Sequence, residues 1–353
     1  MSAERLRDAI RRLANGGSLS ADETADAFDV VMRGEGTPAQ VAALLMALRV
    51  KGETAEEVAG GARAMRHAMV QLSAHDPDTL VDTCGTGGGT VRTFNISTAA
   101  ALLAAGAGVR IAKHGNRSFT TKCGSADVLE ALGVRIDMPV EAMRETLERA
   151  GIVFMFAPLM HPAMRHVGPV RGEIGVPTIM NILGPLANPA SAGRQVMGVA
   201  EEARLPVLAG ALAALGSVHA LVVHGEPGMD EISPLGTTRV LEVCAGTVRE
   251  WAIDAAQFGL RAADAAELAG STPEENANII LRVLRNEVHG GARAAVVLNA
   301  AAALYVGGEV SDYPAALRRA DDALGAGAGL AALERLREAA STAASRQPPR
   351  PGS

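Results

Sequence analysis

The chain carries Gly85-Thr86-Gly87-Gly88-Gly89 and, one β-α-β unit later, Lys113-His114-Gly115-Asn116-Arg117. Hydrophobic runs at 79–82 and 109–112 predict two buried strands, and an alanine- and leucine-rich stretch at 97–107 predicts the helix between them. Consecutive strands joined by a helix run parallel. Ligands of such sheets bind outside the carboxyl ends of the strands, so both glycine stretches should face one cleft.

The first glycine stretch is suited to binding an anion. Glycines allow a phosphate close to backbone N–H groups, and the following helix presents its positive N-terminal end. The run does not match the dinucleotide fingerprint, because Thr90 stands at the third glycine position, and it lacks the ending of a P-loop. A glycine cluster alone is more often a tight turn. The second stretch favours the phosphate interpretation, because His114, Asn116, Arg117 and Ser118 supply many hydrogen-bond donors.

Positive charge is concentrated around these stretches. Residues 81–127 contain five basic and two acidic side chains, within a chain whose formal net charge is −6. Such a local excess attracts a polyanion such as a sugar diphosphate. The other interpretation is a solvated loop with scattered basic groups.

Several segments resemble the anthranilate phosphoribosyltransferase family. They are Asp82-Thr83-Cys84-Gly85-Thr86-Gly87-Gly88, Thr93-Phe94-Asn95-Ile96-Ser97-Thr98, Lys113-His114-Gly115-Asn116-Arg117, Gly124-Ser125-Ala126-Asp127, His161-Pro162-Ala163-Met164 and Asn181-Ile182-Leu183-Gly184-Pro185-Leu186. The resemblance extends from Leu19 to about Gly307. It implies transfer of the phosphoribosyl group of phosphoribosyl pyrophosphate to the amine of anthranilate, with release of pyrophosphate, in tryptophan biosynthesis. Such a reaction depends on positioning and charge stabilisation, so no acid, base or nucleophile is assigned, and His114 is expected to position substrate.

The resemblance also implies the binding residues. For phosphoribosyl pyrophosphate these are Gly85, Gly87, Gly88, Thr93, Asn95, Ser97, Thr98, Lys113 and Ser125. For anthranilate they are Gly85, His114, Asn116, Pro158, Met164 and Arg171, the last holding the carboxylate bidentately. For metal they are Ser97, Asp230 and Glu231, which suits Mg²⁺, two ions per subunit by resemblance. The carboxylate pair follows a predicted strand at 219–224, although an Asp-Glu pair alone is usually solvated surface.

Two positions depart from the family pattern. Gly89 stands where many members have aspartate, and Pro177 stands where many have arginine. The first departure removes any help that a carboxylate gives to metal or ribose binding, and the second removes a donor near the Asn181 segment.

The N-terminal region predicts a helical bundle. Three capping boxes begin at Ser20, Thr37 and Thr54, and each predicts a helix start. We expect a helical domain at 1–72, joined by a segment around 163–182, an α/β domain at 73–340 and a disordered tail at 341–353. The α/β domain should be a mostly parallel sheet flanked by helices, as in nucleoside phosphorylases and phosphoribosyltransferases. So small a bundle has a thin core, and the resemblance implies a homodimer formed through it.

Composition is consistent with a cytoplasmic enzyme. The 353 residues are 48% hydrophobic. The first residues lack the apolar core of a signal peptide, and no apolar run in the sequence reaches membrane-spanning length. Three cysteines form no metal-spaced cluster. Two rival interpretations are a nucleoside phosphorylase of related fold and a non-catalytic nucleic-acid-binding relative. Net charge −6 and nine aromatic residues disfavour the second rival, and we expect no nucleic-acid partner.

Overall fold

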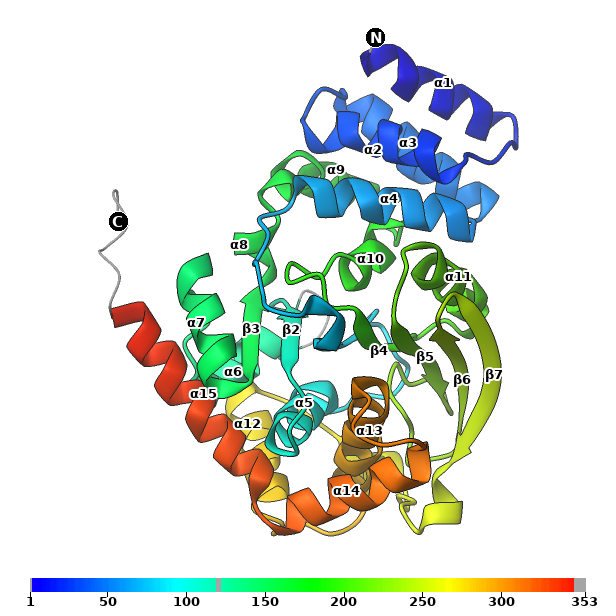
Figure 1. Ribbon diagram of the computed structural model, residues 1–353. Helices are drawn as coiled ribbons and strands as arrows, with labels where there is room; N and C mark the ends of the chain where they lie inside the picture. Colours follow the sequence, from blue (N-terminus) through cyan, green and yellow to red (C-terminus); the bar gives the residue numbers. More distant parts are fainter. Residues whose placement is uncertain (1, 119–121, 346–353) are drawn as a thin grey trace.

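The computed structural model describes residues 2–118 and 122–345, and shows a helical bundle above a larger α/β domain (Figure 1). Four helices form the N-terminal bundle: α1 (Ser2–Ala14), α2 (Ala21–Met32), α3 (Pro38–Lys51) and α4 (Ala55–Ala68). The three predicted capping boxes are confirmed, because Ser20, Thr37 and Thr54 each accept a hydrogen bond from the backbone three residues later. Each glutamate or glutamine at that position bonds back to the cap.

The bundle does not enclose its core alone. Leu44, Leu45 and Leu48 of α3 are fully buried together with Phe28 of α2. The same hydrophobic cluster contains Val167, Ile179 and Ile182 from a later segment, and Met197 and Val222 from the sheet. That later segment comprises α8 (Ala157–Met160), η2 (Pro162–His166), α9 (Gly168–Ile174), α10 (Met180–Leu183) and η3 (Gly184–Leu186). The bundle is therefore stabilised by packing on the α/β domain.

A seven-stranded sheet forms the centre of the α/β domain. Its strands are β1 (Val81–Gly85), β2 (Ile111–Gly115), β3 (Ile152–Phe156), β4 (Arg194–Gly198), β5 (His219–Gly225), β6 (Thr237–Cys244) and β7 (Thr247–Asp254). The spatial order is β3-β2-β1-β4-β5-β6-β7, with the first five strands parallel and the last two antiparallel. The predicted fold class, a mostly parallel sheet with flanking helices and a helical N-terminal region, is confirmed.

Helices cover both faces of this sheet (Figure 1). They are η1 (Pro77–Thr79), α5 (Ile96–Gly106), α6 (Ser125–Ala131), α7 (Val140–Ala150), η4 (Glu202–Arg204), α11 (Leu205–Ala214), η5 (Ala255–Phe258), η6 (Ala265–Leu268), α12 (Pro273–Leu284), α13 (Gly291–Gly307), α14 (Tyr313–Gly325) and α15 (Ala328–Ser345). Side chains alternate between faces, as strand geometry requires. Val196 and Leu221 join α5 and α13 in one core, whereas Met197 and Val222 join α11 in the other.

Two predicted strands begin later than expected. The strand predicted at 79–82 is β1 at Val81–Gly85, and the one predicted at 109–112 is β2 at Ile111–Gly115. The turn η1 occupies residues 77–79, and Gly85 pairs with Gly198 of β4. Gly85 and the Lys113 to Gly115 segment therefore lie in strands, which hold them more rigidly than the predicted loops would.

The prediction of a disordered tail at 341–353 is wrong for its first five residues, 341–345. Residues 341–345 are the last turns of α15, because Ala340 and Ala343 are buried against the cluster that contains Met143 and Val153. Alanine is also the strongest helix former. Residues 346–353 lie outside the described residues. Within the described part of the chain, no helix has the length and apolar character needed to cross a membrane.

The bundle offers a direct test of its capping. Glu57 is fully buried, accepts hydrogen bonds from the N–H groups of Leu19 (3.0 Å) and Thr54 (2.8 Å), and pairs with Lys51 (2.9 Å). Glu57→Ala should lower the free energy of unfolding by about 3 kcal/mol, because it leaves buried donors unpaired. The exposed neighbour Glu56 is the control, and Glu56→Ala should change stability by less than about 0.5 kcal/mol. Equal effects of the two variants in urea denaturation would contradict this role for Glu57.

Candidate active site

Three strand ends meet at the carboxyl edge of the sheet. β1 continues into the glycine stretch, β2 ends in the Lys113 segment, and β5 leads to Asp230 and Glu231. The Gly87 N–H donates to the Asp230 carboxylate (2.9 Å), and the Ser97 N–H donates to the Glu231 carboxylate (3.2 Å). The glycine stretch, the start of α5 and the acidic pair are thus in direct contact.

Lys113 lies at the centre of this arrangement. Its ammonium group is buried and donates to the Thr83 carbonyl, to the Ser97 hydroxyl (3.2 Å) and to the Thr83 hydroxyl (3.3 Å). Burial lowers the pKa of Lys113, while the nearby carboxylate of Asp82 opposes that shift. A cation held in this way between two strand ends would bind a phosphate as a point charge.

The acidic pair is buried, and Lys113 offsets the charge of Glu231 only in part. Burial, and then the adjacent Asp230, raise the pKa of Glu231 to about 8, and burial also raises the pKa of Asp230. Two carboxylates and the Ser97 hydroxyl form the hard oxygen set that Mg²⁺ prefers. Among the described residues, no group of three or more histidine, cysteine or acidic side chains converges as a metal site. The set therefore fits an ion that takes its remaining ligands from substrate phosphates and water.

Small residues make room for the acidic pair. A side chain at Gly85 would lie 2.6 Å from an Asp230 carboxylate oxygen, and one at Gly89 would lie 3.0 Å from the other. A side chain at Gly198 would overlap the Asp230 carbonyl. Gly87 and Gly88 adopt φ of 70° and 85°, a left-handed conformation that favours glycine, and no described atom lies within 4 Å of the side-chain direction at either position.

The other predicted phosphate-site residues form separate groups. Asn95 bonds to Asn276 (2.9 Å) and to Cys123, and the Ser125 hydroxyl donates to the Asn116 carbonyl (3.3 Å). The Thr98 hydroxyl is buried and has no hydrogen-bond partner within the described residues. Thr93 is half-buried between the glycine stretch and α5. Hydrogen bonds thus join Gly87 to Asp230 and link Lys113 through Ser97 to Glu231, whereas the side chains of Asn95 and Ser125 bond to other partners.

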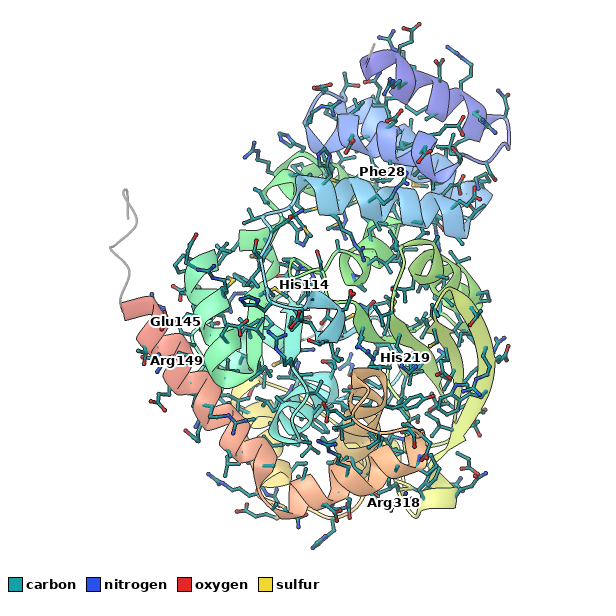
Figure 2. The ribbon with its side chains drawn as sticks, viewed as in Figure 1. Phe28, His114, Glu145, Arg149, His219 and Arg318 are labelled. Carbon is teal, nitrogen blue, oxygen red and sulfur yellow. The ribbon has the colours of Figure 1, made fainter. Side chains whose placement is uncertain are left out.

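The predicted anthranilate residues are more widely spread. His114 is buried at the end of the sheet that faces the bundle, and its Nε2 atom lies 3.2 Å from that of His161 (Figure 2). Arg171 on α9 is half-buried, burial lowers its pKa, and its guanidinium has no hydrogen bond or ion pair to the described residues. Met164 packs on the bundle core and Pro158 is exposed on α8. No hydrogen bond joins Arg171 to His114 among the described residues, so a ligand between them would bind each residue separately.

Reasoning from sequence missed several residues of the site. Asp82, His161 and Asn188 are buried and bonded to its strands, and Gly198 leaves space for Asp230. Asp82 could have been predicted from the sequence, because it is an acidic residue in a run otherwise predicted to be buried. Asn188 could not have been predicted, because its partner Asp82 is 106 positions away in the chain.

Comparison with known proteins places this fold and site in a class. Residues 77–330 match the glycosyl transferase family a/b domain, and residues 7–69 match the helical bundle domain of that family. The molecule is thus a glycosyl transferase built from a helical bundle and an α/β domain.

Individual relatives define the family more narrowly. The chain is 48% identical over 333 residues to an anthranilate phosphoribosyltransferase of Pelotomaculum thermopropionicum, covering 94% of this chain and 96% of the relative. It is 49% identical over 331 residues to that of Rubrobacter xylanophilus, covering 94% and 96%. The crystal structure of the Thermus thermophilus enzyme superposes with a TM-score of 0.89 at 43% identity, covering 95% and 99%. The Saccharomyces cerevisiae enzyme in complex with phosphoribosyl pyrophosphate and Mg superposes at 0.87 and 27% identity, covering 96% and 98%.

The chain belongs to the anthranilate phosphoribosyltransferase family. The resemblance inferred from its motifs is confirmed. Neither rival interpretation, nucleoside phosphorylase or nucleic-acid-binding relative, is favoured by these relatives.

Gly198 provides a test of the acidic pair. Gly198→Ala should displace Asp230, and so weaken Mg²⁺ binding in the presence of pyrophosphate by about tenfold or more, as measured by calorimetry. Gly325→Ala is the control, because no described atom lies within 4 Å of that side-chain direction. Unchanged Mg²⁺ affinity in Gly198→Ala would show that Asp230 does not depend on this space.

The histidine pair predicts a pH dependence of stability. Burial, followed by the neighbouring His161, lowers the pKa of His114 to about 3, and burial lowers the pKa of His161 to about 4. Both values lie below the usual 6.5, so protons bind the unfolded chain first and stability falls as pH decreases from 6 to 5. His161→Gln should reduce this slope by about 1 kcal/mol per pH unit in denaturation experiments.

The exposed His289 is the control for the histidine pair, and His289→Gln should leave the slope as in wild type. A slope that His161→Gln does not reduce would contradict the neutral, buried state of His161.

Proposed function

We propose that this chain transfers the phosphoribosyl group of phosphoribosyl pyrophosphate to the amine of anthranilate and releases pyrophosphate, a step of tryptophan biosynthesis. The observation that carries the proposal is the buried Lys113 ammonium, which is held between β1 and α5 and interacts with the charge of Glu231, one member of the acidic pair. A cation beside a pair of metal-binding carboxylates is the arrangement that a diphosphate and Mg²⁺ require together. Family membership supports the choice of substrates.

Catalysis in this proposal depends on charge and position. The bond between the ribose carbon and pyrophosphate breaks with its electron pair leaving on the pyrophosphate, the lone pair of the amine nitrogen forms the new bond to that carbon, and the amine proton passes to the departing pyrophosphate or to water. Lys113 would neutralise charge that grows on the departing pyrophosphate. When bound, Mg²⁺ would supply further positive charge at the diphosphate, with Asp230, Glu231 and Ser97 as its protein ligands. No nucleophilic side chain is required.

The phosphate contacts are assigned by position at the sheet edge. Around the diphosphate and ribose we place Gly85, Gly87, Gly88, Thr93, Asn95, Ser97, Thr98, Lys113 and Ser125. The Gly87 N–H already donates to Asp230, so binding of metal and substrate would have to replace that bond. The unpartnered hydroxyl of Thr98 would gain a partner from a bound ligand or water.

Anthranilate would bind between the sheet edge and the bundle. The Arg171 guanidinium, half-buried and without an ion pair among the described residues, would hold the carboxylate. His114 and Asn116, on the strand side, would position the ring and amine, with Gly85, Pro158 and Met164 around them. Pro177 is exposed and stands where many family members carry arginine, so a hydrogen-bond donor is absent near the Asn181 segment.

Further properties follow from the family and are proposed with it. They are two Mg²⁺ ions per subunit, a homodimer formed through the helical bundle, a cytoplasmic location, and a division of the chain at residue 72 into helical and α/β domains. The solved yeast relative that contains phosphoribosyl pyrophosphate and Mg supports the use of Mg²⁺.

The direct test is an assay of purified protein with phosphoribosyl pyrophosphate, Mg²⁺ and anthranilate, following the loss of anthranilate fluorescence. We expect Mg²⁺-dependent turnover that Lys113→Ala lowers by at least about 100-fold, because charge stabilisation of the leaving group is lost. Arg318→Ala removes an exposed positive charge at the far end of the molecule, and should retain wild-type turnover (Figure 2). Binding of phosphoribosyl pyrophosphate without consumption of anthranilate would contradict the assigned acceptor.

A further inference from the structure

The pairing of β1 with β2 stops early. β1 pairs with β4 over five residues, and β2 pairs with β3 over five residues. Between β1 and β2 the register contains Val81 opposite Ile111, with the Val81 N–H bonded to the Arg110 carbonyl (2.9 Å). These two strands are the ones that carry the glycine stretch and Lys113. The ladder between them is therefore interrupted at the site itself.

Side chains replace the interrupted ladder. A parallel ladder continuing from Val81 would next bond the Thr83 N–H to the Ala112 carbonyl, and the His114 N–H to the Thr83 carbonyl. Instead, the Asp82 carboxylate accepts from the His114 N–H (3.2 Å). The Ala112 carbonyl accepts from the Asn188 amide (2.8 Å), and the Thr83 carbonyl accepts from the Lys113 ammonium. Three of these four backbone groups, the His114 N–H and the carbonyls of Ala112 and Thr83, thus bond to a side chain in place of the neighbouring strand.

Asp82 and Asn188 act as one buried unit. The exposed fractions of their surfaces are 1% and 4%, and the Asn188 amide donates to the Asp82 carboxylate (2.8 Å). The remaining Asn188 oxygen accepts from the Ala190 N–H (2.9 Å). Asn188 thereby uses both amide hydrogens and its oxygen, which fixes its orientation. Neither residue is among the substrate or metal contacts assigned above.

The interruption determines where Lys113 can bind. If the ladder continued, the His114 N–H would donate to the Thr83 carbonyl and would compete with the Lys113 ammonium for that acceptor. Asp82 accepts from the His114 N–H, and Asn188 donates to the Ala112 carbonyl. His114 and Ala112 are the residues on either side of Lys113 in β2. The unit therefore holds the backbone on both sides of the lysine.

We propose that Asp82 and Asn188 are positioning residues, which hold β1 and β2 apart so that the Lys113 ammonium lies between the strands at the diphosphate site. They act through Lys113 and do not touch substrate. The expected effect on kcat/KM rests on the proposed function. The expected effect on pyrophosphate binding rests on the geometry of the two strands.

Asn188→Ala tests the positioning role. It removes the donor to Asp82 and Ala112, and should lower kcat/KM for phosphoribosyl pyrophosphate and weaken pyrophosphate binding by about tenfold or more, because small displacements of binding groups have large effects. Tyr313→Phe is the matched control. It also removes one buried hydrogen bond, from the Tyr313 hydroxyl to the Leu298 carbonyl (3.0 Å), but on α14, away from these strands.

Thermal denaturation distinguishes positioning from a merely structural role. At a comparable loss of melting temperature, Tyr313→Phe should keep the wild-type kcat/KM and pyrophosphate affinity. An Asn188→Ala protein that loses stability but keeps both quantities within twofold of wild type would overturn the proposal.

Asp82→Asn is the second variant if Asn188→Ala does not fold. It keeps the shape of the side chain but removes the charge and places an amide against the Asn188 amide, so we expect the same loss of pyrophosphate affinity. Wild-type affinity in Asp82→Asn would likewise overturn the proposal. Pyrophosphate binding is measured by calorimetry and needs no turnover. A wild-type protein without transferase activity would thus refute the proposed function while this test still stands.

Discussion

The burial of a lysine ammonium between two parallel strands is the interaction on which the site depends. A buried cation is costly unless opposite charges and hydrogen-bond acceptors surround it. Lys113 has three acceptors from Thr83 and Ser97, and Asp82 and Glu231 supply negative charge nearby. Those acceptors come from β1 and from the start of α5. The positions of both elements are therefore coupled to the lysine.

The same constraint accounts for the small residues around the acidic pair. Asp230 and Glu231 arrive from β5, two strands away from β1, and must approach the glycine stretch closely. Gly85 and Gly198 leave the necessary space at the ends of β1 and β4. Positive charge from Lys113 and negative charge from the pair then lie side by side. A diphosphate with Mg²⁺ is complementary to both.

Local patterns were sufficient to predict much of the fold. The three capping boxes at Ser20, Thr37 and Thr54 each depend on residues within four positions, and the structure confirms all three. Both strands were predicted too early in the chain, because the turn η1 precedes β1, and pairing with β3 and β4, which no local pattern encodes, extends the strands into the glycine and lysine motifs. The tail was wrong because burial of Ala343 is a tertiary contact. The Asp82 to Asn188 bond joins positions 106 apart and was not predictable from either segment.

The position of the diphosphate in a crystal structure of this protein with phosphoribosyl pyrophosphate and Mg²⁺ tests the account most directly. We expect the diphosphate within hydrogen-bonding distance of the Lys113 ammonium, with a Mg²⁺ ion between its oxygens and the carboxylates of Asp230 and Glu231. A diphosphate bound elsewhere, with Lys113 still bonded only to Thr83 and Ser97, would contradict the account.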